Sequence, residues 1–204
     1  RLRGLSPGAA APELAVVKVI ETRLPGALII EPKVFGDERG YFLETYRSNR
    51  YAEHGIPGHL VQDNQSYSRR GVLRGLHIQH PFGQGKLVQV LLGEVFDVAV
   101  DVRRGSATFG QWDGVRLSGE NKRQFWVPPG FAHGFLVTTE TALFVYKCSD
   151  YYHPETEFSL RWDDPSIGID WPLDGPPELS KKDQDAATLA DIPADRLPSI
   201  EDYP

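Results

Sequence analysis

The chain has 204 residues, 40% hydrophobic and 25% charged, a composition that can bury the core of one globular domain. Its formal net charge of −6 argues against non-specific nucleic-acid binding, and it contains no apolar run long enough to span a membrane. We therefore expect neither nucleic acid nor a membrane as a partner. The single cysteine, Cys148, cannot form an internal disulfide, which favours a reducing compartment and a cytoplasmic location.

The first 15 residues, "RLRGLSPGAAAPELA", contain two arginines and several alanines but no long apolar core. We interpret residues 1–15 as a disordered lead rather than a signal peptide. Residues 16–204 are then expected to form one domain.

Short segments rich in β-branched and aromatic residues, separated by glycine and proline, dominate the chain up to about residue 150. They are residues 15–22, 26–32, 40–46, 85–93, 94–102, 123–129, 134–139 and 142–148. Within 94–102 the residues alternate, which places Phe96, Val98, Val100 and Val102 on one face and Val95, Asp97, Ala99 and Asp101 on the other. This spacing predicts an antiparallel sandwich or barrel.

Helices are expected only in residues 48–55 and 181–191. The segment 165–180 carries four prolines and is predicted to be an ordered loop or a wrapping arm. The sequence has no Walker loop, no G-x-G-x-x-G motif and no pair of cysteines spaced for zinc.

The stretch "GVLRGLHIQHPFGQGKLVQV", residues 71–90, places many polar residues between two β-like ends. We interpret it as a hairpin, with Lys86 lying across from His77. Such a hairpin is either exposed to solvent, or its polar side chains line a reaction site inside the fold.

Two partial metal-binding patterns of the cupin type lie near this stretch. "PPGFAHGF" (128–135) matches the Pro-x-Gly-x-x-His pattern through Pro128, Gly130 and His133, but "HIQ" (77–79) replaces the usual His-x-His. At most His77, His80 and His133 could converge, and no glutamate follows at the expected distance to complete the set, whereas zinc or iron prefers three or four strong ligands. We therefore expect a cavity without a metal and no cofactor.

Three side chains near this cavity could carry acid–base chemistry. Histidine exchanges protons near neutral pH, so His77 could act as a general base. Lys86 could hold an anion or a developing oxyanion, and the phenol of Tyr146 could donate a proton to an enolate. Each also fits an ordinary structural role, because polar residues at strand ends are commonly satisfied or solvated.

Ten stretches, in order, resemble the dTDP-4-dehydrorhamnose 3,5-epimerase family from about Val19 to Asp183. They are "FGDERGYFLETY" (35–46), "QDNQS" (62–66), "GVLRGLH" (71–77), "QGKLV" (84–88), "GEVFDVAVDVR" (93–103), "TFGQW" (108–112), "PPGFAHGF" (128–135), "YKCSDYYHPETE" (146–157), "WDDPSIGIDWP" (162–172) and "LSKKD" (179–183). The resemblance implies an all-β, cupin-like jelly-roll barrel with a few short helices and a C-terminal arm.

The resemblance also implies roles for individual residues. His77 matches the catalytic base, Asp183 the carboxylate that orients it, Tyr146 the proton donor and Lys86 a group beside the substrate. Tyr152 matches the ring that stacks on thymine. The remaining substrate-binding positions are Arg39, Glu44, Gln62, Asn64, Arg74, His133, Glu157 and Lys182. Since N-terminal strands of this family reach into the partner subunit, we expect a homodimer in which Arg39 and Glu44 serve the neighbouring site.

The implied reaction is epimerisation of a dTDP-4-keto-6-deoxyhexose at C3, C5 or both, through an enolate, in deoxysugar biosynthesis. Departures from the family pattern are Ile78, Gln89, the 80–82 segment "HPF" and a loop one residue shorter before Lys86. We interpret them as lying beside the base, which leaves a C3-only mono-epimerase as an alternative. A non-catalytic nucleotide-sugar-binding cupin and a metal-dependent cupin enzyme also remain open.

Overall fold

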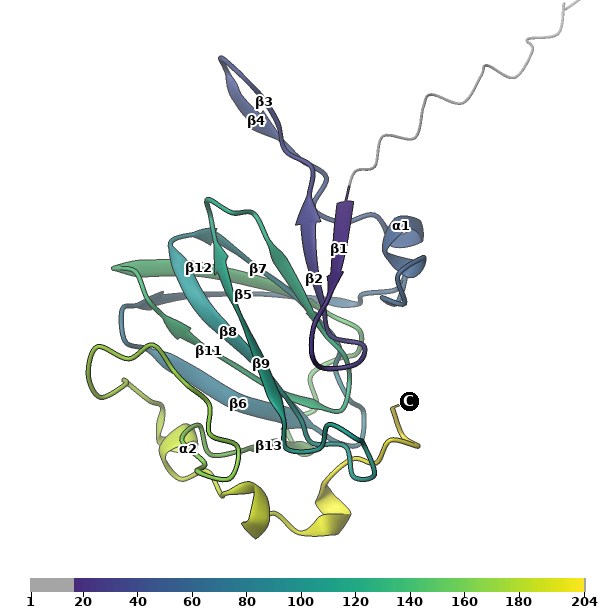
Figure 1. The fold of residues 1–204 in the computed structure, drawn as a ribbon, viewed down its shortest axis with the longest axis vertical. Helices are drawn as coiled ribbons and strands as arrows, with labels where there is room; N and C mark the ends of the chain where they lie inside the picture. The colour runs from purple at the N-terminus through teal and green to yellow at the C-terminus, as the bar shows by residue number, and fades with distance from the viewer. Residues whose placement is uncertain (1–16, 204) are drawn as a thin grey trace, which may run out of the picture.

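The computed structural model describes residues 17–203, so the predicted lead at 1–15 lies outside the described residues. Two antiparallel sheets dominate these residues (Figure 1). One has six strands in the order β1 (Val17–Glu21), β2 (Leu28–Pro32), β10 (Gln124–Val127), β7 (Lys86–Leu92), β12 (Thr141–Cys148) and β5 (Gln62–Arg69). The other has five, in the order β13 (Glu157–Ser159), β6 (Leu73–Gln79), β11 (Phe131–Val137), β8 (Glu94–Asp101) and β9 (Trp112–Ser118).

The strands β5 to β12 form a jelly roll. Their orders, β10-β7-β12-β5 in one sheet and β6-β11-β8-β9 in the other, are those of two interleaved Greek keys. The predicted cupin-like jelly roll is therefore confirmed. Within residues 17–203 no strand pairing joins the two sheets, so the fold is a sandwich with open edges rather than a closed barrel.

The predicted hairpin within residues 71–90 is wrong. β6 and β7 do not pair: β6 lies between β13 and β11, whereas β7 lies between β10 and β12 in the opposite sheet. The 80–85 loop crosses from one sheet to the other, so His77 and Lys86 reach the interior from opposite walls. The polar side chains of this stretch belong to the inside of the fold because two facing sheets can share a cavity.

The alternation predicted for residues 94–102 is confirmed, and both faces of β8 are buried. Val95 and Ala99 pack with residues of both sheets in the core between them. Val98 and Val100 face outward into a second apolar cluster. A strand buried on both faces is central to its sheet, and β8 indeed lies between β11 and β9.

A C-terminal arm covers the outer face of the five-stranded sheet (Figure 1). Phe158, Leu160, Ile167, Trp171 and Leu197 pack there against Val98 and Val100. The wrapping arm predicted for 165–180 is therefore confirmed.

The helix predicted over 181–191 is confirmed only in part. The chain forms α2 (Lys181–Gln184) and then two 3₁₀ turns, Leu189–Asp191 and Ala194–Arg196. Ala187 lies between α2 and the first of these turns and accepts a backbone hydrogen bond from Arg161 (2.8 Å), which draws the chain out of the helix. None of the helices within residues 17–203 is long and apolar enough to cross a membrane.

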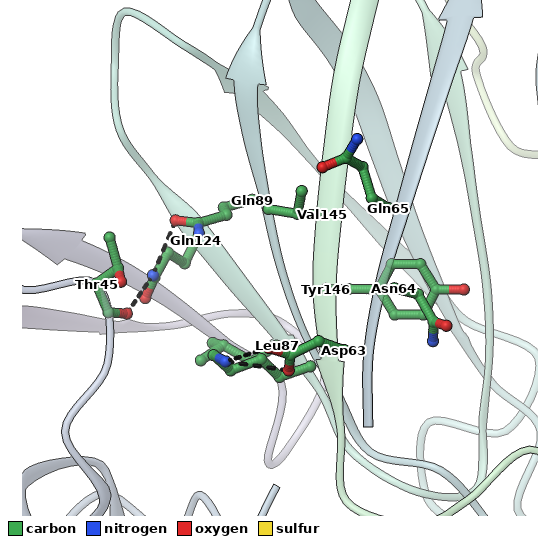
Figure 2. A pocket seen from close by; sticks show the side chains of 10 residues that line it. Thr45, Asp63, Asn64, Gln65, Leu87, Gln89, Gln124, Val145 and Tyr146 are labelled. Atoms are coloured by element: carbon green, nitrogen blue, oxygen red, sulfur yellow. Dashed lines mark hydrogen bonds and ion pairs between the residues drawn. The ribbon is translucent and has the colours of Figure 1, made fainter. Parts of the chain in front are cut away.

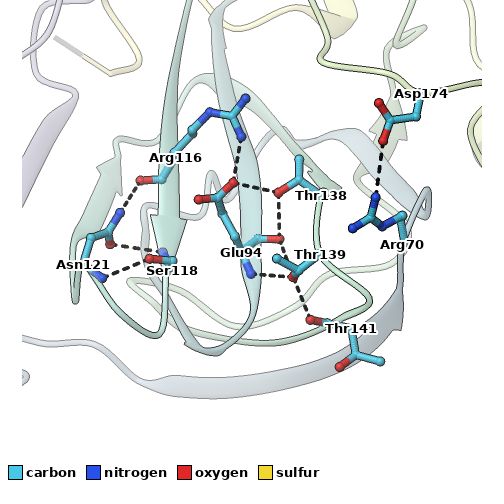
Figure 3. Close-up of polar contacts among 9 residues, drawn as sticks. All are labelled: Arg70, Glu94, Arg116, Ser118, Asn121, Thr138, Thr139, Thr141 and Asp174. Carbon is cyan, nitrogen blue, oxygen red and sulfur yellow. Dashed lines mark hydrogen bonds and ion pairs between the residues drawn. The ribbon is translucent and has the colours of Figure 1, made fainter.

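The turn between β7 and β8 lies at the opposite end of β7 from Lys86, and Figure 3 shows the polar contacts of Glu94, which follows it. Gly93 adopts a positive φ of 74°, and a side chain there would collide with the backbone carbonyl of Thr141. The carboxylate of Glu94 accepts hydrogen bonds from Arg116 Nη1 (2.7 Å) and Thr138 Oγ1 (2.9 Å). These contacts tie β8, β9 and the end of β11 together.

The N-terminal region packs on the outside of the six-stranded sheet. The helix predicted at 48–55 is present as α1 (Ser48–Ala52), and its Tyr51 is buried with Ile30, Leu87 and Trp126. Before it, the hairpin of β3 (Phe35–Asp37) and β4 (Gly40–Phe42) projects away from the sandwich (Figure 1).

Candidate active site

A cavity of about 170 Å³ opens between the two sheets. His77 on β6 and His133 on β11 are cross-strand neighbours on one wall, and Lys86 and Tyr146 come from β7 and β12 on the other. The rest of the lining is Gln65, Ser66, Arg74, Gly134, Phe135 and Phe144. The jelly roll thus gathers side chains that are far apart in the sequence around one small volume.

His77 is paired with a carboxylate from the C-terminal arm. Its Nε2 lies 2.7 Å from Oδ1 of Asp183, which belongs to α2. Ser180 caps this helix, because its hydroxyl accepts from the Asp183 backbone N–H and donates to Asp183 Oδ2 (2.9 Å). The motif "LSKKD" therefore positions the carboxylate through a helix cap, and the carboxylate orients the imidazole.

The surroundings of Asp183 favour its charged form. Burial by itself raises the pKa of this carboxyl, but the hydrogen bonds from His77, Ser180 and the Gly75 backbone outweigh it and hold the pKa below its usual range. An ionised carboxylate on one ring nitrogen fixes the tautomer of His77 and supports a positive charge on it. This is the arrangement that a general base requires.

A second histidine–aspartate pair lies beside the first. His133 Nε2 is 2.8 Å from Oδ1 of Asp97 on β8, and both side chains are buried. Burial raises the pKa of Asp97 despite the opposing effect of His133. Its Oδ2 and the hydroxyl of Ser66 have no hydrogen-bond partner within the described residues. Unpaired buried polar atoms next to a cavity are typical of a site that receives a ligand.

Lys86 and Tyr146 face the histidines from the six-stranded sheet. Burial lowers the pKa of Lys86, and the acidic groups of Cys148, Glu157 and Asp97 partly oppose this effect. Burial also raises the pKa of Tyr146 to about 12. The phenol therefore keeps its proton throughout the ordinary pH range and is able to give it to a stronger base such as an enolate.

Three of the predicted substrate-binding residues form a polar cluster on the rim. Glu157 on β13 accepts hydrogen bonds through Oε2 from Tyr152 Oη (2.9 Å) and Lys182 Nζ (2.6 Å). Burial raises the pKa of Glu157, but these bonds and the charge of His77 keep it below its usual value. The ring of Tyr152 is half exposed, so a flat group can stack on it.

Gln62 and Asn64 are connected to this rim through Tyr152, whereas Arg74 lines the cavity from β6. Gln62 accepts from the Tyr152 backbone N–H (2.9 Å) and donates to Asn64 Oδ1 (3.2 Å). Arg74 lines the cavity, and its guanidinium donates to the hydroxyl of Ser68 from Nε and Nη2 (both 3.1 Å). A guanidinium held in this way retains donors for a diphosphate.

The structure does not bring Arg39 and Glu44 to this cavity. Arg39 lies at the tip of the β3–β4 hairpin, where it is exposed and paired with Asp37. Glu44 pairs with Arg50 of α1 (3.0 Å) on the outside of the six-stranded sheet. Both residues lie on the N-terminal segment, apart from the cavity residues of their own chain.

The interpretation that Ile78 and Gln89 lie beside the base is wrong. Strand alternation turns Ile78 away from His77, into the cluster under the C-terminal arm. Gln89 lines a second pocket of about 340 Å³, which shares Gln65 and Tyr146 with the cavity but not His77, and it accepts a hydrogen bond there from Gln124 (3.2 Å; Figure 2). The other two departures, the 80–82 segment and the shortened loop before Lys86, do adjoin the end of the strand that carries His77.

The three histidines considered as metal ligands do not converge. His80 lies on the 80–85 loop with its Nδ1 3.3 Å from Tyr203 Oη, whereas His77 and His133 bind separate aspartates. Within residues 17–203, no group of three or more histidine, cysteine, aspartate or glutamate side chains is arranged to hold a metal ion.

Sequence reasoning missed several residues of this site, among them Ser66, Asp97, Gln65 and Phe144. For Asp97 a signal was available, because the alternation in 94–102 places a carboxylate on the same face as Val95 and Ala99. A charged residue inside an otherwise apolar strand face needs a buried partner. The other three have no local signal, because their strands were identified by apolar content alone or not at all.

The fold and the cavity define a cupin-type jelly-roll protein with acid–base groups on both walls of its interior. The model of the family described as dTDP-4-dehydrorhamnose 3,5-epimerase matches residues 21–191. The chain belongs to this family of deoxysugar epimerases.

Named relatives agree with this assignment. The dTDP-4-dehydrorhamnose 3,5-epimerase of Salmonella typhimurium is 56% identical, over 84% of this chain and 94% of that protein. The crystal structure of a dTDP-6-deoxy-D-glucose-3,5-epimerase from Legionella pneumophila, in complex with dTDP-4-keto-L-rhamnose, is 59% identical with a TM-score of 0.88, covering 90% and 98% of the two chains. A 3'-monoepimerase from Streptomyces bikiniensis, in complex with dTDP-quinovose, is 37% identical with a TM-score of 0.83, covering 89% and 93%.

Proposed function

We propose that this chain epimerises a dTDP-4-keto-6-deoxyhexose at C3, C5 or both. The observation that carries the proposal is that the His77–Asp183 pair and the phenol of Tyr146 reach one cavity from opposite sheets. An inversion at carbon needs a base on one face of the sugar and an acid on the other, and these two walls supply them.

The reaction begins with removal of a proton. The 4-keto group makes the C–H bonds at C3 and C5 weakly acidic, because the resulting carbanion is delocalised onto the C4 oxygen. His77 accepts the proton and becomes positively charged, and the ionised Asp183 stabilises that charge. The C–H electron pair moves into the enolate, and no electron leaves the sugar, so the step needs no redox partner.

The reaction ends with proton delivery from the opposite wall. Tyr146 gives its proton to the enolate carbon, which inverts the centre, and its phenolate then regains a proton from water. Lys86 donates to the C4 oxygen while the negative charge is present there. A fixed donor aimed at a developing oxyanion typically contributes several kcal/mol.

Apart from Arg39 and Glu44, the predicted binding residues either line the cavity or take part in the contacts at its rim. In this proposal Arg74, with Gln62 and Asn64, holds the polar part of the nucleotide, and His133 binds the sugar. Tyr152 stacks on thymine, and Glu157 and Lys182 keep its ring in place through their shared contacts. Guanidinium groups suit a diphosphate because they donate two parallel hydrogen bonds.

We also propose a homodimer in which the N-terminal segment of each chain completes the site of the other. The β3–β4 hairpin projects from the sandwich, and Phe35, Tyr41 and Phe42 on it are exposed, Phe42 to 71%. Exposed aromatic groups clustered on one element typically mark an interaction surface. Arg39 and Glu44 lie on or just after this hairpin and would reach the partner's cavity. Light scattering of Phe42→Asp should give a monomer where the parent chain gives a dimer, and a dimeric variant would contradict the exchange.

A C3-only mono-epimerase is the second candidate, favoured by the similarity to the Streptomyces bikiniensis 3'-monoepimerase. We propose that either enzyme works in the cytoplasm, since Cys148, the chain's one cysteine, is a buried free thiol.

The test is incubation with dTDP-4-keto-6-deoxyglucose in D₂O, followed by NMR of the sugar. Deuterium and inversion at C3 and C5 support the 3,5-epimerase, and deuterium at C3 alone supports the mono-epimerase. Tight dTDP binding without any deuterium would make the protein a nucleotide-sugar-binding cupin and overturn the proposal.

A further inference from the structure

The last described residues form a tail that lies along the segment following β8. Arg104 donates its backbone N–H to Pro198 O (2.8 Å), and Ile200 donates to Arg104 O (3.0 Å). Asp202 accepts from both the backbone N–H and the hydroxyl of Ser199 (2.7 and 2.8 Å). The tail is therefore tied to the body of the fold up to its final described residue, Tyr203.

A buried ion pair anchors the backbone of Tyr203. Arg103 Nη1 donates to the carbonyl oxygen of Tyr203 (2.9 Å). Arg103 is itself held by Asp101, which accepts from its Nε and Nη2 (both 3.0 Å), and both side chains are buried. An arginine fixed in this way offers a defined docking point rather than a mobile surface contact.

The ring of Tyr203 lies between two glycines. A β-carbon on Gly83 would come within 2.7 Å of the ring carbon Cζ, and one on Gly130 within 2.9 Å of Cδ2. The hydroxyl of Tyr203 accepts the backbone N–H of Gly83 (2.8 Å), and the ring meets His80 edge-on at 5.8 Å between centroids. The absence of side chains at these two glycines is what makes room for the ring.

The loop that Tyr203 contacts also supports the rim of the site. The 80–85 loop joins the strand of His77 to that of Lys86, and it binds the 149–153 segment, which carries Tyr152. Gly85 donates its N–H to Ser149 Oγ (2.8 Å), and Gln84 Nε2 donates to Asp150 O (2.9 Å). Lys86 is held separately, because it is paired within the sheet with Val127 and Cys148.

We propose that Tyr203 is a positioning residue for substrate binding: it locks the 80–85 loop, which holds the 149–153 segment and Tyr152 at the mouth of the cavity. The inference rests on the proposed function, since it assigns Tyr152 to the nucleotide. The sheet pairing of Lys86 does not involve the loop, whereas the 149–153 segment is bound by the loop as well as by Gln62 and Gln79, so loss of Tyr203 acts mainly on KM and less on kcat.

The first test compares Tyr203→Phe, which removes only the hydroxyl, with Glu201→Ala, an exposed position on the same tail. In Tyr203→Phe we expect hydrogen exchange to become about threefold to tenfold faster in the 80–85 peptide, with the core strands unchanged. The KM for the nucleotide sugar and the Kd for dTDP should rise with it, whereas Glu201→Ala should match the parent chain. Unchanged exchange in 80–85, or faster exchange without a change in KM and Kd, would overturn the proposal.

A double-mutant cycle supplies the second test. Gly83→Ala forces the Tyr203 ring out of place, so it should raise KM about tenfold. Tyr203→Ala, which removes the ring, should raise KM by a similar factor. In the Tyr203→Ala background the same glycine change should add little, because the clash is gone. If the effects of the two substitutions on KM were additive, the proposal that Tyr203 holds the loop through Gly83 would be contradicted. Hydrogen exchange is measured without substrate, so it tests the contact between Tyr203 and the 80–85 loop whether or not the parent chain binds dTDP. A parent chain that fails to bind dTDP would contradict only the proposed function.

Discussion

The two histidine–aspartate pairs of this protein look alike and differ in what surrounds them. His77 and His133 are cross-strand neighbours, and their Nε2 atoms lie 2.7 and 2.8 Å from a carboxylate oxygen. Yet the pKa of Asp183 is lowered and that of Asp97 is raised. Asp183 accepts further hydrogen bonds from Ser180 and the Gly75 backbone, whereas Asp97 Oδ2 has no partner within residues 17–203.

Burial raises the pKa of both carboxyls, and the hydrogen bonds to Asp183 outweigh this effect whereas the contacts of the more deeply buried Asp97 do not. The His77 side chain is 25% exposed and that of His133 only 7%, so His77 is the imidazole that can receive a proton and later release it to solvent. The first pair fits the proposed role of base, and the second, with its nearly enclosed imidazole, fits the proposed role of sugar binding. The predictions below test this division.

The largest effect is expected for His77→Ala. Deuterium exchange into the sugar should fall by about 10²–10⁴-fold, the usual contribution of a general base, while dTDP still binds. The exposed His54, changed to alanine, serves as the control. Exchange at a tenth or more of the parent rate would remove His77 from the role of base and with it the contrast between the two pairs.

Tyr146→Phe should separate exchange from inversion. The change keeps the ring and its packing and removes the proton donor, so His77 still takes a proton and solvent deuterium still enters the sugar. Inverted product should form about 10²-fold more slowly, because the opposite face then depends on water. NMR of the sugar in D₂O reports both quantities. A variant that inverts as fast as it exchanges would show that the hydroxyl has no part in the reaction.

Asp183→Asn should lower exchange by about 10-fold to 10²-fold and cost about 1–3 kcal/mol of unfolding free energy at neutral pH. The pKa of Asp183 is lower in the folded than in the unfolded state. Its stabilising contribution is therefore present above the pKa of the unfolded state and is lost as pH falls through the pKa of the folded state. Urea unfolding at several pH values should therefore show the two proteins converging below about pH 4. A difference in unfolding free energy between the two proteins that stays constant with pH would show that Asp183 contributes through packing alone.

Asp97→Asn should act in the opposite direction on stability. A raised pKa means that the native state binds the proton of Asp97 more tightly than the unfolded state does. The resulting contribution to the unfolding free energy is present below the pKa of the unfolded state and is lost as pH rises through the pKa of the folded state. The asparagine variant should match the parent chain near pH 4 and equal or exceed its unfolding free energy at pH 8. Its exchange rate should change less than that of Asp183→Asn, and a larger loss would make the second pair the working one.

The smallest effect is expected from chelation. Prolonged treatment with EDTA should leave exchange and inversion unchanged, because the histidines of the cupin pattern bind aspartates or the tail instead of converging. Elemental analysis of the untreated protein accompanies the assay. One equivalent of a transition metal per chain, with activity lost on its removal, would assign both pairs to a metal site instead.

Local pattern determined much of this protein. The alternation in 94–102 predicts both faces of β8 correctly, and the proline-rich 165–180 segment is a wrapping arm as expected. Alternation also carried the information that Ile78 and Gln89 turn away from the cavity, although they were interpreted as lying beside the base. Such features depend on the period of a strand and on backbone restrictions, which neighbouring residues set.

Only the tertiary structure decided which strands face one another. A turn after a strand does not reveal whether the chain pairs back or crosses to another sheet, so β6 and β7 were expected to form a hairpin and instead lie in opposite walls. The contacts of Asp97 with His133, and of Tyr203 with Gly83, join residues 36 and 120 positions apart. Their partners are chosen by the packing of the whole sandwich, because a buried polar group is satisfied by whatever the fold brings within reach.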